Sequence, residues 1–239
     1  MTGVHVHVPS VKRNHRPSSR KKVIVSPRVL VVYYSATGSV HRLAEAVAAG
    51  AGSAGADVRL RRVAELAPAE AIASNPAWAA HREETNAAVE LATLDDLEWA
   101  DGYAFGTPTR YGAPAAQLKQ FIDSAGGLWQ EGKLADKPVT VFVSSAEQHG
   151  GQESTILSLN NVFYHWGSVI VPLGYTDDIV YEAGGNPYGT SWPAGFPSTM
   201  PDEVTLRCAR YQGVRLARFA ALLAPARMTA SGAPAAAGR

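Results

Sequence analysis

The chain has 239 residues, and its 22 Lys and Arg side chains nearly balance its 21 Asp and Glu, which leaves a formal net charge of +1. This balance argues against a surface devoted to nucleic acid, and no apolar run approaches the roughly 20 residues that span a bilayer, so we expect neither nucleic-acid binding nor membrane insertion. The single cysteine, Cys208, excludes a disulfide framework and a CxxC metal or redox site.

The two ends of the chain differ in composition from the middle. Residues 1–27 carry several Lys and Arg and no acidic residue, and they lack the apolar segment of a secretory signal. We expect a disordered basic extension there, with a basic arm that touches anionic surfaces as the alternative. Residues 224–239, rich in Ala, Pro and Gly, are expected to form a flexible tail. Between them we expect one cytoplasmic domain, residues 28–223.

The first predicted strand leads into a loop that is suited to binding an anion. An apolar run at residues 29–34 is followed by a Ser/Thr/Gly turn at residues 35–40, where a helix begins. Backbone N–H groups at a helix start lack partners and lie at the positive end of the helix dipole, and Ser35, Thr37 and Ser39 add hydroxyl groups. The turn therefore predicts a phosphate cradle. A serine-capped turn without a ligand is the alternative.

The same loop excludes two common nucleotide-binding motifs. It has no Lys and no GKS/T ending, so it is not the P-loop of a nucleotide-triphosphate enzyme, and it lacks the GxGxxG fingerprint of dinucleotide-binding folds. A phosphate held by neutral donors alone suits FMN, because its phosphomonoester needs hydrogen bonds and no metal.

After this loop, apolar and amphipathic segments alternate along the chain. Residues 67–89 form a long irregular insert in which we expect only short helical pieces, and such inserts are often lids or binding loops. The remaining predicted elements, in chain order, are a helix at 40–54, a strand at 57–63, a helix at 94–99, a strand at 102–106, a helix at 115–124, a strand at 139–144, a helix at 154–166, a strand at 169–173, a loop at 184–201 and a helix at 202–223.

The repeated strand–helix pattern indicates an α/β fold with a mostly parallel sheet and helices on both faces. The carboxyl ends of parallel strands share one edge of the sheet, and folds of this kind bind their ligands outside that edge. Three loops should meet there, at residues 35–40, 107–113 and 144–153.

The second and third of these loops carry groups that suit a flavin ring. Pro108 stiffens the second loop, Tyr111 offers an aromatic surface, and Arg110 can place positive charge beside the reduced flavin. Backbone amides at residues 109–112 and in the glycine-rich third loop can bind the polar edge of the ring. The alternatives are a proline-stabilised turn with a surface arginine and a flexible connector.

Four blocks in chain order carry a resemblance to a known family. They read FGTPTRYG at residues 105–112, GGLW at 126–129, GNPYG at 185–189 and ARYQG at 209–213. With them, the chain resembles the WrbA family of flavodoxin-like NAD(P)H:quinone oxidoreductases. The resemblance implies a doubly wound, flavodoxin-like sheet of five parallel strands in the order 2-1-3-4-5. It also implies FMN as cofactor, NADH or NADPH as co-substrate, a homotetramer, and two-electron reduction of quinones to hydroquinones, the activity of an NAD(P)H dehydrogenase (quinone).

The resemblance also implies roles for individual residues. It assigns the FMN phosphate to Ser35, Gly38, Ser39 and Val40. It assigns the flavin ring to Pro108, Thr109, Arg110, Tyr111, Gly112, Ser144, Gly150 and Gly151. His165, from a neighbouring subunit, and Trp129 would line the cavity over the ring, where His165 would donate to the quinone oxygen and Tyr175 would add a hydroxyl group. From the residues alone, His165 is equally well a helix-terminal histidine, and Trp129 is equally well a core residue.

The sequence departs from the family pattern at two places. Residues 146–149 read AEQH where the family commonly has TGTG, and Ala113 replaces a residue that is commonly polar. Glu147 near the ring would make the local field more negative and lower the flavin potential. A flavodoxin-type electron-transfer protein is the alternative function, but the net charge of +1 argues against the strongly acidic docking face of such carriers.

Overall fold

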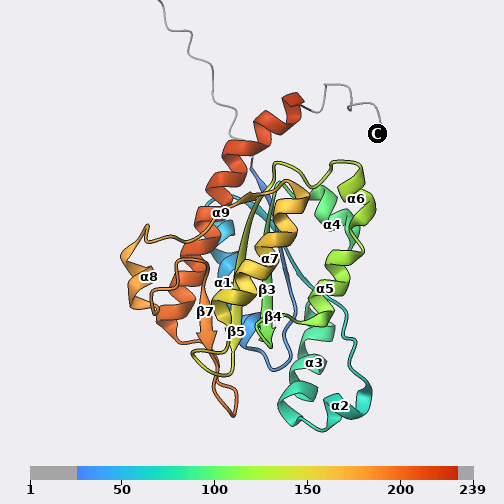
Figure 1. The fold of residues 1–239 in the computed structure, drawn as a ribbon, viewed down its shortest axis with the longest axis vertical. Coiled ribbons are helices and arrows are strands. Elements are labelled where there is room, and N and C mark those ends of the chain that lie inside the picture. Colours follow the sequence, from blue (N-terminus) through green and yellow to red (C-terminus); the bar gives the residue numbers. More distant parts are fainter. Residues whose placement is uncertain (1–25, 231–239) are drawn as a thin grey trace, which may run out of the picture.

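A parallel sheet forms the centre of the computed structural model, which describes residues 26–230. Its main path runs β2-β1-β3-β5-β6, and each neighbouring pair on this path is parallel (Figure 1). These strands are β1 (Arg28–Tyr33), β2 (Asp57–Arg62), β3 (Gly102–Arg110), β5 (Pro138–Ser145) and β6 (Val169–Ile170). Because β3, β5 and β6 are the third to fifth parallel strands of this path, the predicted flavodoxin-like order 2-1-3-4-5 is confirmed.

Two short strands share the fifth position of the sheet. The strand β6 pairs with the beginning of β5, and β7 (Ser191–Pro193) pairs in parallel with its end. Between them lie residues 171–190 with the short helix α8 (Asp178–Glu182). The predicted strand at 169–173 was therefore too long, because Pro172 has no N–H with which to continue the ladder. The predicted loop at 184–201 was wrong at β7.

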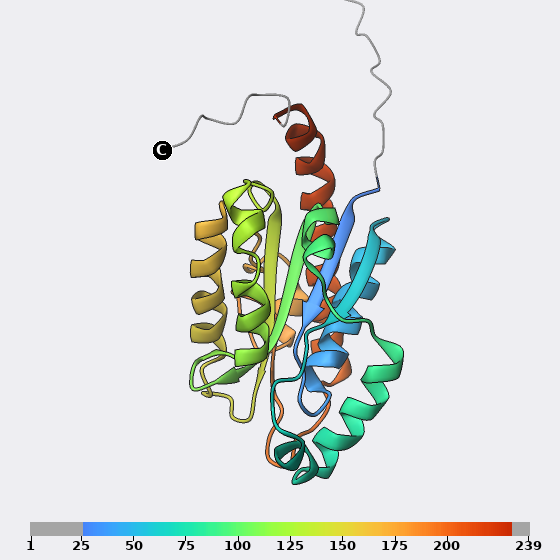
Figure 2. The same ribbon diagram turned by 90° about the vertical axis from the view of Figure 1, so that its right-hand side faces the viewer.

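Helices cover both faces of the sheet, as predicted (Figure 2). Successive side chains of a strand point to opposite faces, so Leu30 and Val32 pack beneath α5 and α7 whereas Val29 and Val31 pack beneath α1 and α9. The helices of the first face are α4 (Leu94–Trp99), α5 (Ala116–Asp123), α6 (Gly126–Gln130) and α7 (Gln152–Trp166); those of the second are α1 (Ser39–Ser53) and α9 (Glu203–Ala230).

The helices α1 and α9 touch backbone to backbone at two glycines. A Cβ atom on Gly50 would lie 1.9 Å from the Arg210 carbonyl oxygen, and one on Gly213 would lie 2.0 Å from the Val47 carbonyl oxygen. No other residue type fits at either position without moving a helix, so these two glycines set the separation of α1 and α9.

The insert at residues 67–89 is more helical than the sequence analysis predicted. It contains α2 (Ala69–Ala73) and α3 (Pro76–Ala88), and α3 has 13 residues. The Asn75 side chain accepts hydrogen bonds from the amides of Ala77 and Trp78 and so caps the start of α3. Both helices lie beyond the carboxyl ends of the strands (Figure 1).

The last helix is longer than predicted. It continues to Ala230, so the predicted flexible tail is wrong for residues 224–230, where buried Ala224 still packs against the body of the protein. The predictions for residues 1–25 and 231–239 fall outside the described part of the chain. Within that part, no helix combines the length and apolar character needed to cross a membrane.

Candidate functional site

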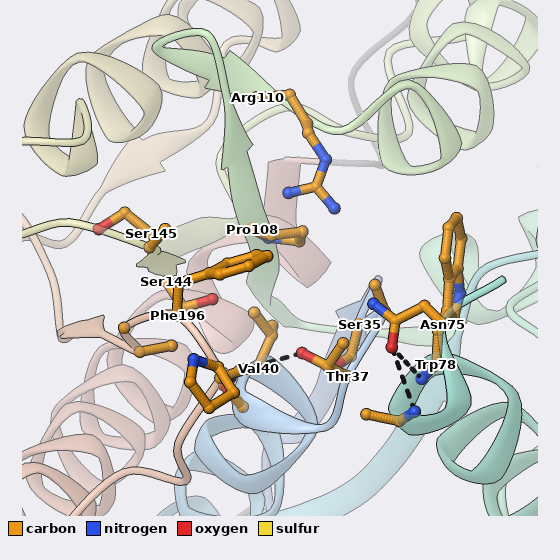
Figure 3. Close-up of a pocket in the computed structure, with 18 residues that line it drawn as sticks. Ser35, Thr37, Val40, Asn75, Trp78, Pro108, Arg110, Ser144, Ser145 and Phe196 are labelled. Carbon is orange, nitrogen blue, oxygen red and sulfur yellow. Dashed lines mark hydrogen bonds between the residues drawn. The ribbon is translucent and has the colours of Figure 1, made fainter. Parts of the chain in front are cut away.

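A cavity of about 430 Å³ opens at the carboxyl edge of the sheet, where the three predicted loops meet (Figure 3). Its volume falls in the range of roughly 300–1,000 Å³ that is common for small-molecule sites. The lining residues come from the three loops, the insert and the segment after β7: Ser35, Ala36, Thr37, Ser39, Val40, Asn75, Ala77, Trp78, Pro108, Arg110, Ser144, Ser145, Ala146, Ala194, Gly195, Phe196, Pro197 and Ser198.

The first loop joins β1 to α1 and has the geometry of an anion cradle. Gly38 has φ 103°, a left-handed conformation that favours glycine, and its amide donates to the Ser35 hydroxyl at 3.1 Å. The first amides of α1 have no acceptor inside the helix. The Ser39 hydroxyl donates to the Thr199 carbonyl oxygen at 3.0 Å, which ties the cradle to the segment after β7.

Two neutral histidines lie behind this cradle. The Tyr33 hydroxyl and His41 Nδ1 are 2.5 Å apart, and the rings of His41 and His81 are 5.4 Å apart. Burial lowers the pKa of His41, although Glu45 opposes the shift, and burial together with His41 lowers the pKa of His81 to about 4. A Cβ on Gly38 would lie 3.5 Å from His81 Nδ1. Near neutral pH the cradle thus offers neutral donors.

The second loop contributes Pro108 and Arg110 to the cavity wall, and Arg110 is the charged side chain among the described lining residues. Its guanidinium donates to the Thr109 carbonyl oxygen at 3.1 Å. Tyr111 is fully exposed with φ 53°, and Gly112 faces the third loop. Thr109, Tyr111 and Gly112 are absent from the cavity lining in the described chain.

The third loop meets the second at closely packed backbone. A Cβ on Gly151 would lie 2.9 Å from the Gly112 Cα atom, and the Ser154 hydroxyl donates to the Gly112 carbonyl oxygen at 3.1 Å. Ser144 lines the cavity together with Ser145 and Ala146. In the described chain, the residues that line the cavity do not include Glu147, Gly150 or Gly151. The two glycines therefore shape the third loop and do not form the cavity wall.

The structure separates three predicted residues from this cavity. His165 and Trp129 lie together near the start of β5, at the opposite edge of the sheet, where Trp129 Nε1 donates to the His165 carbonyl oxygen at 2.7 Å. Tyr175 stacks on Tyr181 with ring centroids 5.0 Å apart and donates to the Gly185 carbonyl oxygen. In the part of the chain that the structure describes, none of the side chains of His165, Trp129 and Tyr175 lines the cavity of its own chain.

Two segments that line the cavity contain none of the predicted site residues. The insert supplies Asn75, Ala77 and Trp78; its length favoured a lid or binding loop, but no residue in it was assigned a role. The segment after β7 supplies Phe196 and Ser198, and no motif in the sequence marks it.

A half-buried carboxylate, Glu65, holds the insert against the rest of the site. Glu65 accepts hydrogen bonds from the Tyr34 hydroxyl at 2.9 Å, from Trp78 Nε1 at 3.0 Å and from Gln117 Nε2 at 2.8 Å. Burial alone would raise the pKa of Glu65, but hydrogen bonds from the Ala67 amide and these side chains outweigh it and hold the pKa below its ordinary value. Glu65 therefore positions Trp78 at the cavity wall.

Comparison with known proteins identifies relatives of this chain. The NADPH-dependent FMN reductase family matches residues 27–176. The NAD(P)H dehydrogenase (quinone) of Geotalea uraniireducens is 46% identical over 206 residues, which cover 82% of this chain and 99% of that protein. The same-named protein of Deinococcus radiodurans is 42% identical over 181 residues, which cover 75% and 90%. The crystal structure of a WrbA-like flavodoxin from Agrobacterium tumefaciens has a TM-score of 0.59 at 28% identity and covers 83% of this chain and 99% of its own.

Removal of the Glu65 carboxylate should release Trp78. We expect Glu65→Ala to lower the free energy of unfolding by about 1–3 kcal/mol, because buried Tyr34 and half-buried Trp78 and Gln117 lose their acceptor, and to increase acrylamide quenching of Trp78 fluorescence. Urea unfolding gives the first quantity; the difference in quenching between each protein and its Trp78→Phe derivative gives the second. Since the pKa of Glu65 is lowered in the folded state, its contribution should be present above the ordinary carboxyl pKa and disappear as the pH falls through the folded value.

Glu70→Gln, which changes an exposed carboxylate on α2, is the matched control and should change neither quantity. Unchanged stability and quenching in Glu65→Ala would contradict the anchoring role of Glu65.

Proposed function

The chain belongs to the NADPH-dependent FMN reductase family, and on that premise we propose that it is an FMN-dependent NAD(P)H dehydrogenase (quinone). The observation that carries the proposal is the cavity, in which a phosphate-type loop and two loops suited to a flavin ring meet at one edge of the sheet. Relatives that are 42–46% identical and bear the name NAD(P)H dehydrogenase (quinone) support the same activity.

The residues present fit FMN at both ends of the cavity. Thr37 and Ser39 offer hydroxyl groups beside the free amides of α1, as a phosphate requires. Trp78 and Pro108 offer apolar surface from opposite sides of the cavity, and Arg110 offers the positive charge. When bound, FMN supplies the redox chemistry, namely hydride acceptance from NADH or NADPH and two-electron delivery to a quinone.

Each part of the chain then has a defined task. The loop with Ser35, Gly38, Ser39 and Val40 binds the phosphate. The second and third loops orient the ring: Pro108, Arg110 and Ser144 contact it, and the remaining predicted residues shape these two loops around it, namely Thr109, Tyr111, Gly112, Gly150 and Gly151. The α2–α3 insert, held by Glu65, limits water access from the side of Trp78.

The first test is whether the purified protein carries flavin and works without a partner. We expect absorbance near ~450 nm, as for oxidised flavin cofactors, and steady NADH or NADPH oxidation with benzoquinone. A protein that holds FMN but needs a separate reductase would instead be an electron carrier, and a protein that neither copurifies with nor binds added FMN would contradict the proposal.

The phosphate loop is tested by Gly38→Asp. It should abolish flavin retention, because it forces a side chain onto φ 103°, within 2.9 Å of the Met200 methyl carbon, and adds a carboxylate to the cradle. Gly55→Asp is the matched control, since Gly55 has φ 87° and nothing within 4 Å of its Cβ position. It should retain flavin. If both variants retain flavin, the phosphate lies elsewhere.

Arg110 should raise the reduction potential of the bound flavin. Its guanidinium is always charged and stabilises the reduced flavin, which carries more negative charge than the oxidised one. Arg110 is exposed, so we expect Arg110→Ala to lower the two-electron potential by roughly 10–30 mV, equivalent to about 0.5–1.4 kcal/mol. A redox titration measures the shift. Arg110→Lys should restore most of it, and Arg218→Ala, on α9 far from the cavity, should cause none.

His165 can act on the cavity only from another subunit, so we propose a homotetramer in which His165 and Trp129 of one chain cover the cavity of another. Exposed apolar side chains on and near α7 support an interface there, with Trp129 52%, Tyr164 67% and Leu157 45% exposed.

Mixed assemblies test this arrangement. His165→Ala should lose activity but keep flavin, whereas Gly38→Asp should lose flavin but still supply His165. Coexpression of the two variants should therefore restore part of the activity in mixed tetramers, and sedimentation should show assembly of the wild type. An active monomer, or mixtures no more active than the two parents, would overturn the proposal.

A further inference from the structure

The turn after β7, residues 194–199, bridges the two ends of the cavity. At one end the amide of Ala194 donates to the Ser145 carbonyl oxygen at 2.7 Å, and that of Gly195 donates to the Ala146 carbonyl oxygen at 2.8 Å. At the other end the Thr199 carbonyl oxygen accepts from the Ser39 hydroxyl at 3.0 Å. The turn is thus fixed both to the third loop and to the phosphate cradle.

Ser198 places a third hydroxyl group in the cradle. Its oxygen lies 3.1 Å from the Thr37 hydroxyl oxygen and 3.1 Å from the Ser39 hydroxyl oxygen. Three hydroxyl groups from two distant segments therefore converge at the start of α1. A hydroxyl group can turn to donate its one hydrogen to an anion, so Thr37 and Ser198 can both donate to a phosphate group while Ser39 keeps its hydrogen bond to Thr199.

Phe196, two residues earlier, presents its ring to the cavity. The side chain lines the cavity yet is 94% exposed. In Figure 3 it lies with Ser144 and Pro108 on one side, while Asn75 and Trp78 lie on the other. An apolar ring left uncovered beside the loops assigned to the flavin ring gains free energy when a flat aromatic ligand packs on it.

We propose that residues 194–199 form a fourth FMN-binding loop, in which Ser198 donates a hydrogen bond to the phosphate and Phe196 packs against the isoalloxazine ring. The inference rests on the proposed function, since FMN is the occupant. It adds two binding residues, one for each end of the cofactor, from a segment that lies far from the other loops in the sequence.

Parallel titrations with FMN and riboflavin separate the two roles, because riboflavin has the same ring and lacks the phosphate. The measurement is the dissociation constant from quenching of flavin fluorescence, with flavin-free protein. Ser198→Ala should weaken FMN binding about tenfold, as expected for a lost hydrogen bond to a charged group, and leave riboflavin binding unchanged.

Phe196→Ala should weaken the binding of FMN and riboflavin by the same factor, about tenfold for the loss of an aromatic contact. Phe196→Tyr should restore both. Two matched controls should change neither constant: Ser74→Ala, directly after α2, and Leu222→Ala, an exposed apolar position on α9. Thermal unfolding confirms that every variant is folded.

Every other outcome contradicts one part of the proposal. Equal weakening of FMN and riboflavin by Ser198→Ala would mean that Ser198 acts through the shape of the turn, and unchanged FMN binding would remove it from the site. Unchanged constants in Phe196→Ala would exclude the ring contact. If the wild type binds FMN and reduces quinones while both variants match it, only this inference fails. If the wild type binds neither flavin, the proposed function fails with it.

Discussion

Parallel pairing of β1, β3 and β5 is the constraint on which the site depends. The register pairs Tyr33 with Gly106 and Pro108 with Ser144, so the three strands end at one edge and their loops meet there. Backbone groups of the strands form the hydrogen bonds of the sheet. The side chains of the loops that follow these strands are therefore not needed for strand pairing and are free to bind a ligand. The return of β7 to the end of β5 then adds the turn at 194–199 to the same edge. One sheet register thus assembles groups from four distant parts of the chain.

The elements that the sequence predicted well are those that bury a continuous apolar face. For β1, β5 and α1 the predicted bounds differ from the observed ones by one residue at each end, because their apolar spacing follows directly from burial against the sheet. The helix α3 was missed because it buries only His81 and Thr85, which leaves no apolar period to detect. The strand β7 was missed because its Gly- and Pro-rich surroundings favour a loop.

The residues of the candidate site likewise fall into those that the sequence could predict and those that it could not. Ser35, Arg110 and Ser144 could be predicted, because strand–loop–helix spacing and family motifs mark their loops. The wall residue Trp78 could not, because it depends on the hydrogen bond to Glu65, a contact made only in the folded chain. Placement of the turn after β7 likewise depends on backbone bonds to Ser145 and Ala146. His165 was named through resemblance, and the fold of a single chain puts it at the opposite edge.

The close contact at Gly50 and Gly213 links the first helix of the domain to the last. Contacts between residues so far apart in sequence close late and slow folding. On the ribosome, α1 is available early to cover its part of the face of the sheet that it shares with α9, but the part beneath α9 stays uncovered until α9 has been synthesised. The Ser39 hydroxyl at the start of α1 likewise gains its acceptor, the Thr199 carbonyl oxygen, only late in the synthesis of the domain. A nascent chain stopped before α9 would expose those apolar side chains of this face that pack against α9 to the protein quality-control machinery of the cell.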